Sequence, residues 1–260
     1  MIRGLYTSGW SILALNKKMD VIANNMANVN TAGYKKDNVI FETFPEILTK
    51  RINDTISSRL NPSGRIGSME LSSDVGEVFT YYRQGQLVRT DNMFDLAIRD
   101  SGTAFFTLQA LDENGNAREC YTRDGQFSLN SGGRLVSSEG YGVMGENGPV
   151  FLKGDSFSVM EDGTIIQDGE AVDRLLIKDF ANPGTLRTIG SNLAAATAET
   201  VEKDFDGTVE QGFYEQSNVD IVREMVDMIT VMRAYEANQK MIQAHDSTLE
   251  RAVNEVGNIR

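Results

Sequence analysis

Apolar residues near the C-terminus recur at alternating steps of four and three positions, beginning at Ile221. This 3.5-residue repeat lets one helix keep the same face against another helix over many turns. No glycine lies between Gly212 and Gly257 and no proline follows Pro183, so nothing interrupts the pattern. We therefore predict one long helix over residues 217–256. Its apolar seam comprises Ile221, Met225, Met228, Met232, Tyr235, Ile242, Leu249, Val253 and Val256, with Gln239 and Asp246 as polar members.

A second seam runs along the N-terminal segment, where the same step starts at Leu5. Nothing breaks a helix between Gly9 and Gly33, and Gly33 stands where a left-handed C-terminal cap is expected. We therefore predict an N-terminal helix that ends before Gly33. Its seam comprises Leu5, Ser8, Ile12, Leu15, Met19, Ile22, Met26 and Val29.

The two predicted helices stand at opposite ends of the chain, which implies that the chain leaves and returns to the same place. One interpretation is an ordinary antiparallel helix pair that covers a core. The alternative follows from length, because an uninterrupted helix over residues 217–256 would be roughly 60 Å long. The shorter N-terminal helix covers only part of it. We favour the interpretation in which the remaining seam contacts other chains.

Four asparagines, Asn24, Asn25, Asn28 and Asn30, fall near the end of the predicted N-terminal helix. Asparagine is unfavourable inside a helix because its amide competes for backbone hydrogen bonds. One interpretation is a frayed helix end with asparagine capping. The other is that these amides bond to a neighbouring segment or chain, where they can donate and accept at once. The residues alone do not separate the two.

Residues 37–70 carry no clear period. Phe41, Phe44, Pro45, Ile47 and Leu48 suggest a short turn or helix. The polar residues 53–68 that follow contain a Pro-Ser-Gly turn signal at positions 62–64, so a surface connection is expected there.

From about Leu71 the period changes to two, and glycine turn signals recur. Asn-Gly and Asp-Gly favour tight hairpin turns because both central residues need positive φ. The turn signals are Asn114-Gly115, Asp124-Gly125, Gly132-Gly133, Glu139-Gly140, Asn147-Gly148, Asp162-Gly163 and Asp168-Gly169. Candidate strands between and around them are 105–110, 119–122, 126–129, 157–160, 164–166 and 175–180. The fold class is therefore predicted as α+β: long terminal helices, paired as in a coiled coil, carry a mostly antiparallel β domain of sandwich or barrel type.

Composition narrows the classes of partner. The chain has 260 residues, a formal net charge of −12 and a pI near 4.6, which argues against nucleic acid or an anionic membrane surface. The single Cys120 excludes an intrachain disulfide. No run of eighteen apolar residues occurs, so no spanning helix is expected. Lys17, Lys18 and Asp20 interrupt the start before an apolar h-region develops, so no secretory signal peptide is expected.

Candidate catalytic chemistry is sparse. The one histidine, His245, lies in the long helix beside the seam, and Cys120 lies on a predicted strand, with nothing in the sequence to bring them together. Residues 112–116 superficially resemble a calcium loop, but their glycine is fourth where an EF-hand needs it sixth, so a hairpin turn is preferred. We therefore predict no catalytic residue, no cofactor and no metal site.

Both ends of the chain resemble bacterial flagellar rod and hook proteins. The N-terminal motif covers residues 4–36 and includes Ala-Asn-Asn-Met-Ala-Asn-Val-Asn-Thr-Ala-Gly-Tyr-Lys-Lys; further matching stretches are 84–87, 90–92, 95–98, 121–127, 211–220, 225–229 and 233–238. One departure concerns the Gly-x-Gly-Phe-Phe of relatives, which reads Gly102-Thr-Ala-Phe-Phe106 here. It puts the local turn in doubt.

The resemblance implies a structural subunit of the flagellar rod, the drive shaft between motor and hook, and no enzyme. Residues 1–36 with 211–260 would form the polymerising domain, residues 71–183 an outer β domain, and residues 37–70 with 184–210 the connections. The subunit interface would then comprise most of the seam residues together with four asparagines: Leu5, Ile12, Leu15, Met19, Ile22, Met26, Asn24, Asn25, Asn28, Asn30, Ile221, Met225, Met228, Met232, Tyr235, Ile242, Leu249 and Val253. Partners would be further copies, other rod and hook proteins and the flagellar type III export apparatus. The location would be the extracytoplasmic basal body, in the periplasm or cell wall, reached without a cleaved signal.

Position within the rod stays open. The length suits a rod protein; the termini resemble the distal rod, and residues 140–150 resemble proximal-rod relatives. A different class of function also stays open, namely a β-domain hydrolase or ligand-binding module that its helices merely dimerise. The rod hypothesis predicts termini that are disordered or protease-sensitive in the monomer and ordered in the assembly, because the seams lack their neighbours' burial.

Overall fold

The computed structural model describes residues 2–43, 47–50, 65–69, 73–111, 117–154, 156–190 and 192–256. The chain divides into two compact units. The helical unit comprises Met1–Asn24, Asp37–Phe79 and Val222–Arg260, and the β unit comprises Asn25–Lys36 and Thr80–Ile221. The domain boundaries expected from the sequence stay a prediction. No helix among the described residues is both long and apolar enough to cross a membrane.

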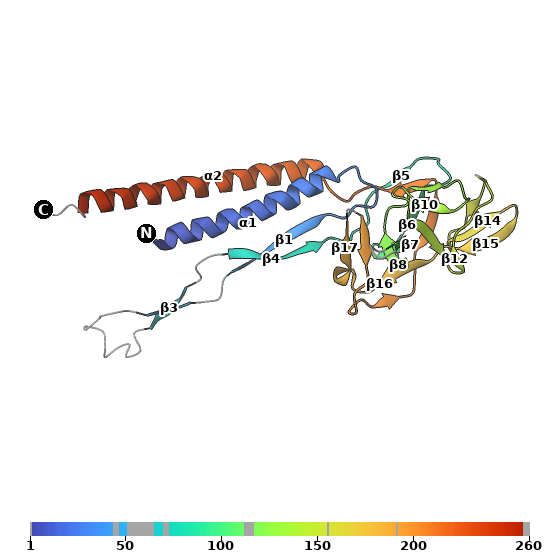
Figure 1. Cartoon of the computed structure of the whole chain (residues 1–260), viewed down its shortest axis with the longest axis horizontal. Helices are drawn as coiled ribbons and strands as arrows, with labels where there is room; N and C mark the ends of the chain where they lie inside the picture. The colour runs from blue at the N-terminus through green and yellow to red at the C-terminus, as the bar shows by residue number, and fades with distance from the viewer. Residues whose placement is uncertain are drawn as a thin grey trace. The chain divides into compact units, whose positions relative to one another are not determined.

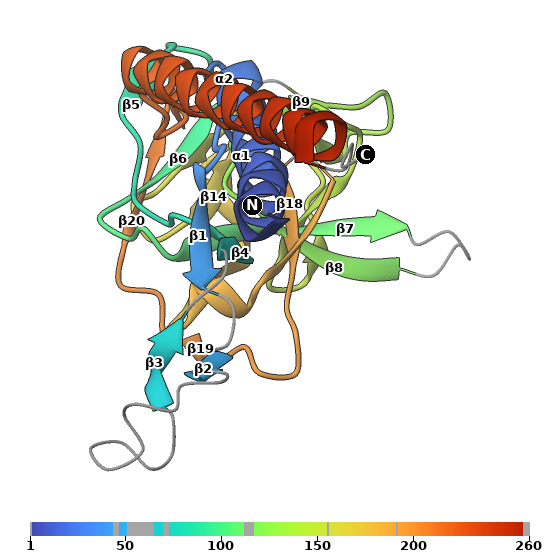
Figure 2. The same ribbon diagram turned by 90° about the vertical axis from the view of Figure 1, so that its left-hand side faces the viewer.

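Two long α-helices dominate the helical unit. α1 spans Ile2–Ala27, and α2 spans Ile221–Arg251 and continues as a π-helical turn over Ala252–Val256. The helices run side by side in opposite directions, with the N- and C-termini at the same end (Figures 1 and 2). A Cβ at Gly4 of α1 would lie 2.5 Å from Nε2 of His245 in α2, so the helix backbone approaches the imidazole closely there. Both predicted helices are confirmed, although α2 begins four residues later than expected.

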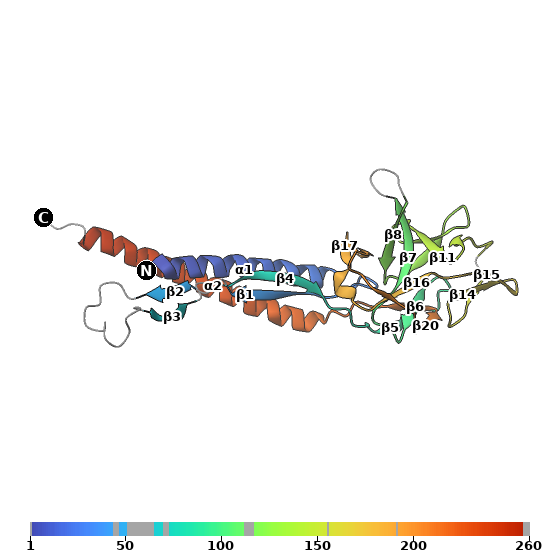
Figure 3. The ribbon, with the colours of Figure 1, turned by 90° about the horizontal axis from the view of Figure 1, so that it is seen from below.

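The segment after α1 forms strands rather than the expected turn or helix. β1 (Asp37–Thr43) pairs with β4 (Ser73–Thr80), and β2 (Ile47–Lys50) pairs antiparallel with β3 (Arg65–Met69), as Figure 3 shows. The physical reason is composition: Val39, Ile40, Phe41 and Thr43 are β-branched or aromatic and fit a pleated surface. Phe44 and Pro45 lie outside the described residues, as do 53–64 of the expected surface connection.

Packing holds β1 near α1. Val39 is buried, and the Lys18 ammonium lies 5.6 Å from the centroid of the Phe41 ring, within the range of a cation–π contact. A two-stranded ribbon is marginal by itself in water, so this attachment to the helix supports it.

Antiparallel pairing organises the β unit. Its largest sheet has ten strands in the described part of the chain, with the path β17-β18-β8-β7-β11-β10-β9 and with β12, β16 and β19 paired beside it. The strands of this sheet are β7 (Ala104–Leu111), β8 (Ala117–Thr122), β9 (Phe127–Leu129), β10 (Leu135–Ser137), β11 (Gly142–Gly145), β12 (Gly148–Pro149), β16 (Ile177–Phe180), β17 (Arg187–Ile189), β18 (Leu193–Ala195) and β19 (Glu202–Lys203). Smaller sheets contain β5 (Leu87–Arg89), β6 (Leu96–Arg99), β13 (Ser158–Val159), β14 (Thr164–Gln167), β15 (Glu170–Arg174), β20 (Thr208–Gln211) and β21 (Phe213–Glu215). The predicted α+β class with a mostly antiparallel central domain is confirmed.

Hairpin chemistry explains the connection between β14 and β15. Asp168 and Gly169 adopt φ of 55° and 85°, the paired positive values that a primed turn needs. The departure from the Gly-x-Gly-Phe-Phe pattern is also resolved, because Ala104 begins β7 as an ordinary strand residue with 0% exposure. A methyl group is therefore accommodated at the second glycine position of that pattern.

The core of the β unit is closed to solvent. Leu96, Phe106, Leu108, Leu135 and Ile165 are at most 1% exposed. Full burial of such a side chain contributes about 1.5–3 kcal/mol, so this cluster stabilises the unit. A second cluster of Phe105, Tyr121, Phe180, Leu186 and Ala194 adds edge-to-face and tilted ring contacts.

Candidate functional site

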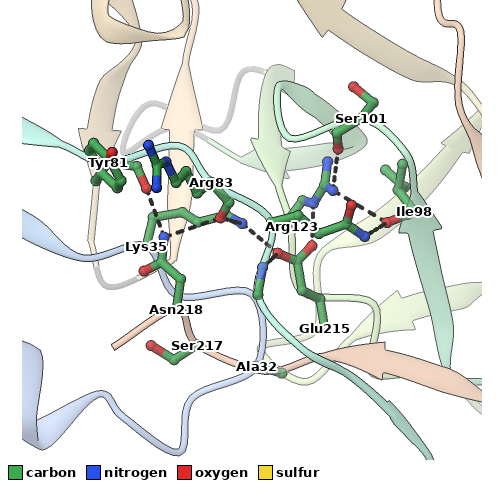
Figure 4. A network of polar contacts seen from close by, with 12 residues as sticks. Ala32, Lys35, Tyr81, Arg83, Ile98, Ser101, Arg123, Glu215, Ser217 and Asn218 are labelled. Carbon is green, nitrogen blue, oxygen red and sulfur yellow. Dashed lines mark hydrogen bonds and ion pairs between the residues drawn. The ribbon is translucent and has the colours of Figure 1, made fainter. Parts of the chain in front are cut away.

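A buried charged cluster lies in the β unit where the segment after α1 meets the segment before α2. The Lys35 ammonium and the Arg123 guanidinium donate to the two carboxylate oxygens of Glu215, each at 2.5 Å (Figure 4). The side chains of Lys35, Arg123 and Glu215 are only 5%, 1% and 1% exposed. We call these three residues the junction triad.

Backbone groups complete the triad. The Gly85 N–H donates to Glu215 Oε1 at 2.6 Å, and Lys35 Nζ donates to the Arg83 carbonyl at 2.8 Å. The Arg123 guanidinium donates to main-chain carbonyls of the segment 98–104, those of Ala104, Ser101 and Ile98. Burying charges is costly unless their hydrogen-bonding capacity is used, and here carbonyls and a carboxylate use it.

Two cations sharing one anion leave the cluster with an excess positive charge. Burial lowers the pKa of Lys35 to about 8; the Glu215 carboxylate opposes this shift and the Arg123 guanidinium adds to it. At neutral pH, below that value, the ammonium form is retained. The Glu215 carboxylate therefore supplies the negative charge that stabilises both buried cations.

Gly33 brings the two chain segments into contact. It adopts φ of +68°, and its N–H donates to the Glu215 carbonyl at 2.7 Å. A Cβ at this position would lie 2.4 Å from the Arg123 carbonyl carbon, so a side chain has no room. The left-handed conformation was expected, but not its place: α1 ends at Ala27, so Gly33 closes a later turn instead of capping the helix.

Asn218 extends the network to a third segment. Its Nδ2 donates to the carbonyls of Tyr81 at 2.8 Å and Arg83 at 3.1 Å, while its Oδ1 accepts from the Lys36 N–H at 2.7 Å. The segment that follows α1 and the segment that precedes α2 are thereby joined to each other and to residues 81–83 of the β unit. The amine of Lys35 is the member with a lowered pKa, and it is buried and engaged by Glu215 and the Arg83 carbonyl, so the arrangement holds structure.

Asparagines near the end of α1 form hydrogen bonds within the chain. Asn25 is 1% exposed and accepts from the Tyr34 hydroxyl at 3.2 Å, and Asn28 accepts from the Thr31 hydroxyl at 3.2 Å. Asn24 and Asn30 are exposed. As contacts between subunits, all four stay a prediction.

The seam of α1 lies on its covered side. Ser8 and Ile22 are buried, and the remaining seam residues Leu5, Ile12, Leu15, Met19 and Met26 are half-buried. A different face is exposed to solvent: Tyr6 by 65%, Trp10 by 40% and Leu13 by 58%.

The seam of α2 is divided between a covered and an exposed face. Its members Met228, Tyr235, Ile242 and Leu249 are half-buried, whereas Ile221, Met225, Met232 and Val253 are 43%, 42%, 50% and 71% exposed. The covered stripe includes Glu224, Val231, Asn238, His245 and Ala252. Each of these residues directly precedes a position that the apolar pattern assigned to the seam. The seam residues therefore do not all serve one contact.

The two residues with candidate reactivity have structural surroundings. Cys120 on β8 belongs to the core of the β unit at 2% exposure, and burial raises the pKa of its thiol, which disfavours the nucleophilic thiolate. His245 faces the α1 backbone at Gly4. No group of three metal-ligating side chains occurs among residues that the structure describes. The calcium-like residues 112–116 lie outside them.

Three protein families match separate stretches of the chain. Residues 12–35 match the family described as flagella basal body rod protein, and residues 97–167 match the flagellar hook protein FlgE/F/G D1 domain. Residues 210–255 match the flagellar basal body rod FlgEFG protein C-terminal family. The flagellar basal-body rod protein FlgG of Buchnera aphidicola subsp. Baizongia pistaciae is 35% identical, over 96% of this chain and 98% of that protein. This chain belongs to the flagellar basal-body rod protein family.

Other rod proteins are similar over their full length. FlgG of Bacillus subtilis is 33% identical over 98% of this chain and 99% of that protein. The flagellar basal-body rod protein FlgF of Rhizobium meliloti is 32% identical over all of both chains. The resemblance noted in the sequence is thus confirmed at the level of the family.

In this rod protein the junction triad draws one residue from each matched stretch. Lys35 ends the first, Arg123 lies in the second and Glu215 lies in the third. The matched stretches therefore include the triad, although neither the apolar seams nor the turn signals predict it. Lys35 and Glu215 are 180 positions apart, and only folding shows that two charged residues at such a separation meet.

Proposed function

We propose that this protein is a structural subunit of the flagellar rod that polymerises axially through α1 and α2, with the β unit facing outward. Family membership supports a place in the rod. The relatives named FlgG at 33–35% identity support the distal rod, since FlgG is the distal member. A proximal position is the second candidate, supported by the FlgF relative and by the resemblance of residues 140–150.

The observation that carries the proposal is the exposed apolar surface of α2. Val222, Val226 and Ile229 are 63%, 57% and 52% exposed although the helix already has a covered stripe. Removing apolar surface from water is worth about 25 cal/mol per Å², so these residues favour association. The proposed subunit contacts are the exposed members of the α2 seam, namely Ile221, Met225, Met232 and Val253. The coiled-coil-like pairing within one subunit uses the covered members of both seams.

The proposal includes partners and location. The subunit contacts further copies of itself and other rod and hook proteins, is exported by the flagellar type III apparatus, and acts in the extracytoplasmic basal body without inserting into a membrane. The buried thiol with a raised pKa supports a role without catalysis. The hydrolase alternative has no such supporting geometry in the described residues.

A deletion strain tests the proposal. We expect cells that lack the gene to be non-motile and to contain basal bodies whose rod stops before the hook, as seen by electron microscopy of isolated basal bodies. The full chain supplied from a plasmid should restore rod and hook. Normal rods in the deletion strain would refute the structural role. A rod that stops after its proximal part would indicate that this protein forms the distal rod, whereas a rod that lacks its proximal part would indicate the proximal position.

A further inference from the structure

One exposed face of α1 combines aromatic and basic side chains. Tyr6, Trp10 and Leu13 follow the four-and-three spacing of a single helix face and are 65%, 40% and 58% exposed. Arg3 and Lys17 continue the same face at its two ends and are also exposed. We call Tyr6, Trp10 and Leu13 the aromatic stripe.

The exposed face of α2 has a different chemistry. Val222, Met225, Val226, Ile229 and Met232 are 63%, 42%, 57%, 52% and 50% exposed. Their spacing of three and four residues also places them on one face. We call these five residues the methionine stripe. Thioether sulfur packs favourably against aromatic rings, so the two stripes are chemically complementary.

The stripes lie at different levels of the helix pair. Because Gly4 faces His245 and the helices are antiparallel, Trp10 stands level with about residue 239 of α2. The methionine stripe is centred about twelve residues nearer the start of α2, which corresponds to about 18 Å at 1.5 Å per residue. The two stripes of one chain are therefore separated along the pair.

We propose that the aromatic stripe of one copy docks on the methionine stripe of the next copy, displaced by about 18 Å along the helix axis. This inference rests on the proposed function and names the surfaces that meet. Charge supports this pairing, since α1 carries three basic and one acidic side chain whereas α2 carries four basic and five acidic ones. Helices of opposite net charge attract each other more than two copies of the same helix.

The symmetry of such a contact explains open growth. Two different surfaces that meet head to tail leave one of each kind unoccupied at the ends, so further copies can add. A contact between two aromatic stripes would instead be isologous and would close a dimer. A subunit that forms a shaft needs the first arrangement.

The displacement also fixes which side chains meet. With α1 antiparallel to the neighbour's α2, Leu13 lies beside Met225 of the neighbour and Tyr6 lies beside its Met232. Trp10 falls between them, against Val226 and Ile229. If the displacement differed by seven residues, the two side chains of each pair would lie about 10 Å further apart along the helix axis.

Cross-linking in assembled rods tests these pairs. Cells co-express a Leu13→Cys chain and a Met225→Cys chain, and isolated basal bodies are treated with a short bismaleimide; Cys120 is buried and is retained. We expect a two-chain product from this mixture, at least about fivefold more than from either variant alone or from the mismatched Leu13→Cys and Met232→Cys mixture, because the mismatch adds about 10 Å. The Tyr6→Cys and Met232→Cys mixture should also react.

The outcomes separate the two hypotheses. Rods that contain the variants but give equal products from matched and mismatched pairs, or a product from Leu13→Cys alone, would overturn the inference and leave the proposed function intact. Absence of this chain from wild-type rods would overturn the proposed function itself.

A second test does not depend on cysteine. Leu13→Glu should abolish motility, and Met225→Lys in the same chain should restore it at least partly, because the opposite charges meet across the contact between copies. Failure of Met225→Lys to restore any assembly of a Leu13→Glu chain that still folds would contradict the proposed pairing.

Discussion

In the β unit, Phe106, Leu108 and Leu135 are at most 1% exposed, whereas Val222, Val226 and Ile229 of the helical unit expose more than half of their surface. Charged groups differ in the same way. Lys35, Arg123 and Glu215 are buried with mutual partners, while the charges of α1 and α2 are mostly at the surface. The β unit therefore closes a core and a charged cluster of its own, whereas the helical unit has a continuous apolar helix face for a neighbour to cover.

The largest expected effect comes from breaking the junction triad. Glu215→Gln removes the carboxylate and leaves the Lys35 and Arg123 cations buried together. Breaking a buried ion pair in this way costs about 3–5 kcal/mol. Urea unfolding followed by circular dichroism measures the loss.

The matched control for the triad is Glu210→Gln. Glu210 pairs with Arg99 at the surface, with side chains 24% and 53% exposed. Exposed pairs contribute about 0.2–1 kcal/mol, so this variant should unfold almost as the wild type does. Equal losses in the two variants would show that the burial of the triad has no special role.

A second prediction concerns pH and Asp124, in the turn beside Arg123. Burial raises the pKa of Asp124 to about 6; the Gln126 N–H opposes this, and Glu139 and Asp95 add to it. Since the folded-state pKa exceeds the ordinary 3.8, the ionised carboxylate costs stability above pH 6, and stability is regained as pH falls towards 4. Asp124→Asn should therefore stabilise the protein at pH 7–8 by up to about 3 kcal/mol.

Thermal unfolding of the Asp124→Asn variant at several pH values checks this sign. The difference from wild type should shrink between pH 6 and pH 4, where the wild-type carboxyl becomes neutral in the folded state. The same stabilisation at pH 4 and pH 8 would mean that the carboxylate charge is not the cause.

A smaller effect is expected between the helices. Gly4→Ala places a methyl group against the His245 imidazole, whereas Gly9→Ala meets nothing within 4 Å. Alanine improves helix propensity by about 1 kcal/mol in α1, so Gly9→Ala should slow amide exchange there. Gly4→Ala should not show this stabilisation, because its methyl group meets the imidazole. The double variant Gly4→Ala with His245→Ala should show it again, because the imidazole is absent. A coupling near zero in this double-mutant cycle would contradict the close approach.

The smallest effect on unfolding is expected from Met232→Lys, on the exposed face of α2. The free energy of unfolding of the isolated protein should change by less than about 0.5 kcal/mol, because surface substitutions seldom do more. Rod assembly should nevertheless fail, since a buried charge at a subunit contact is expensive. Swarming assays and electron microscopy of basal bodies measure the effect, with Lys240→Gln as a surface control.

The sequence predicted what depends on local period. Apolar spacing revealed α1 and α2, and Asp-Gly signals located the turn between β14 and β15. It misplaced residues 37–43 and 47–50, which form strands that depend on pairing partners and, for β1, on packing against α1. The prediction of one seam on α2 could not show that His245 lies on the covered face, because that depends on Gly4 in the opposite helix.

The candidate site was predicted only in part. The pattern of apolar residues identifies positions able to form contacts. It does not distinguish contacts within the chain from contacts between copies. The junction triad escaped because its members are 92 and 180 positions apart, and no local pattern records such a meeting.

The hydrogen bond from the Gly33 N–H to the Glu215 carbonyl has a consequence for how such chains diversify. Residues 34–214 form an excursion that begins and ends at nearly one point. A body of another size can join those two points at the same spacing, provided that Lys35 is retained and that the new body supplies a guanidinium at the position of Arg123. The segment between Gly33 and Glu215 can thus be exchanged as a module, both in evolution and by protein engineering.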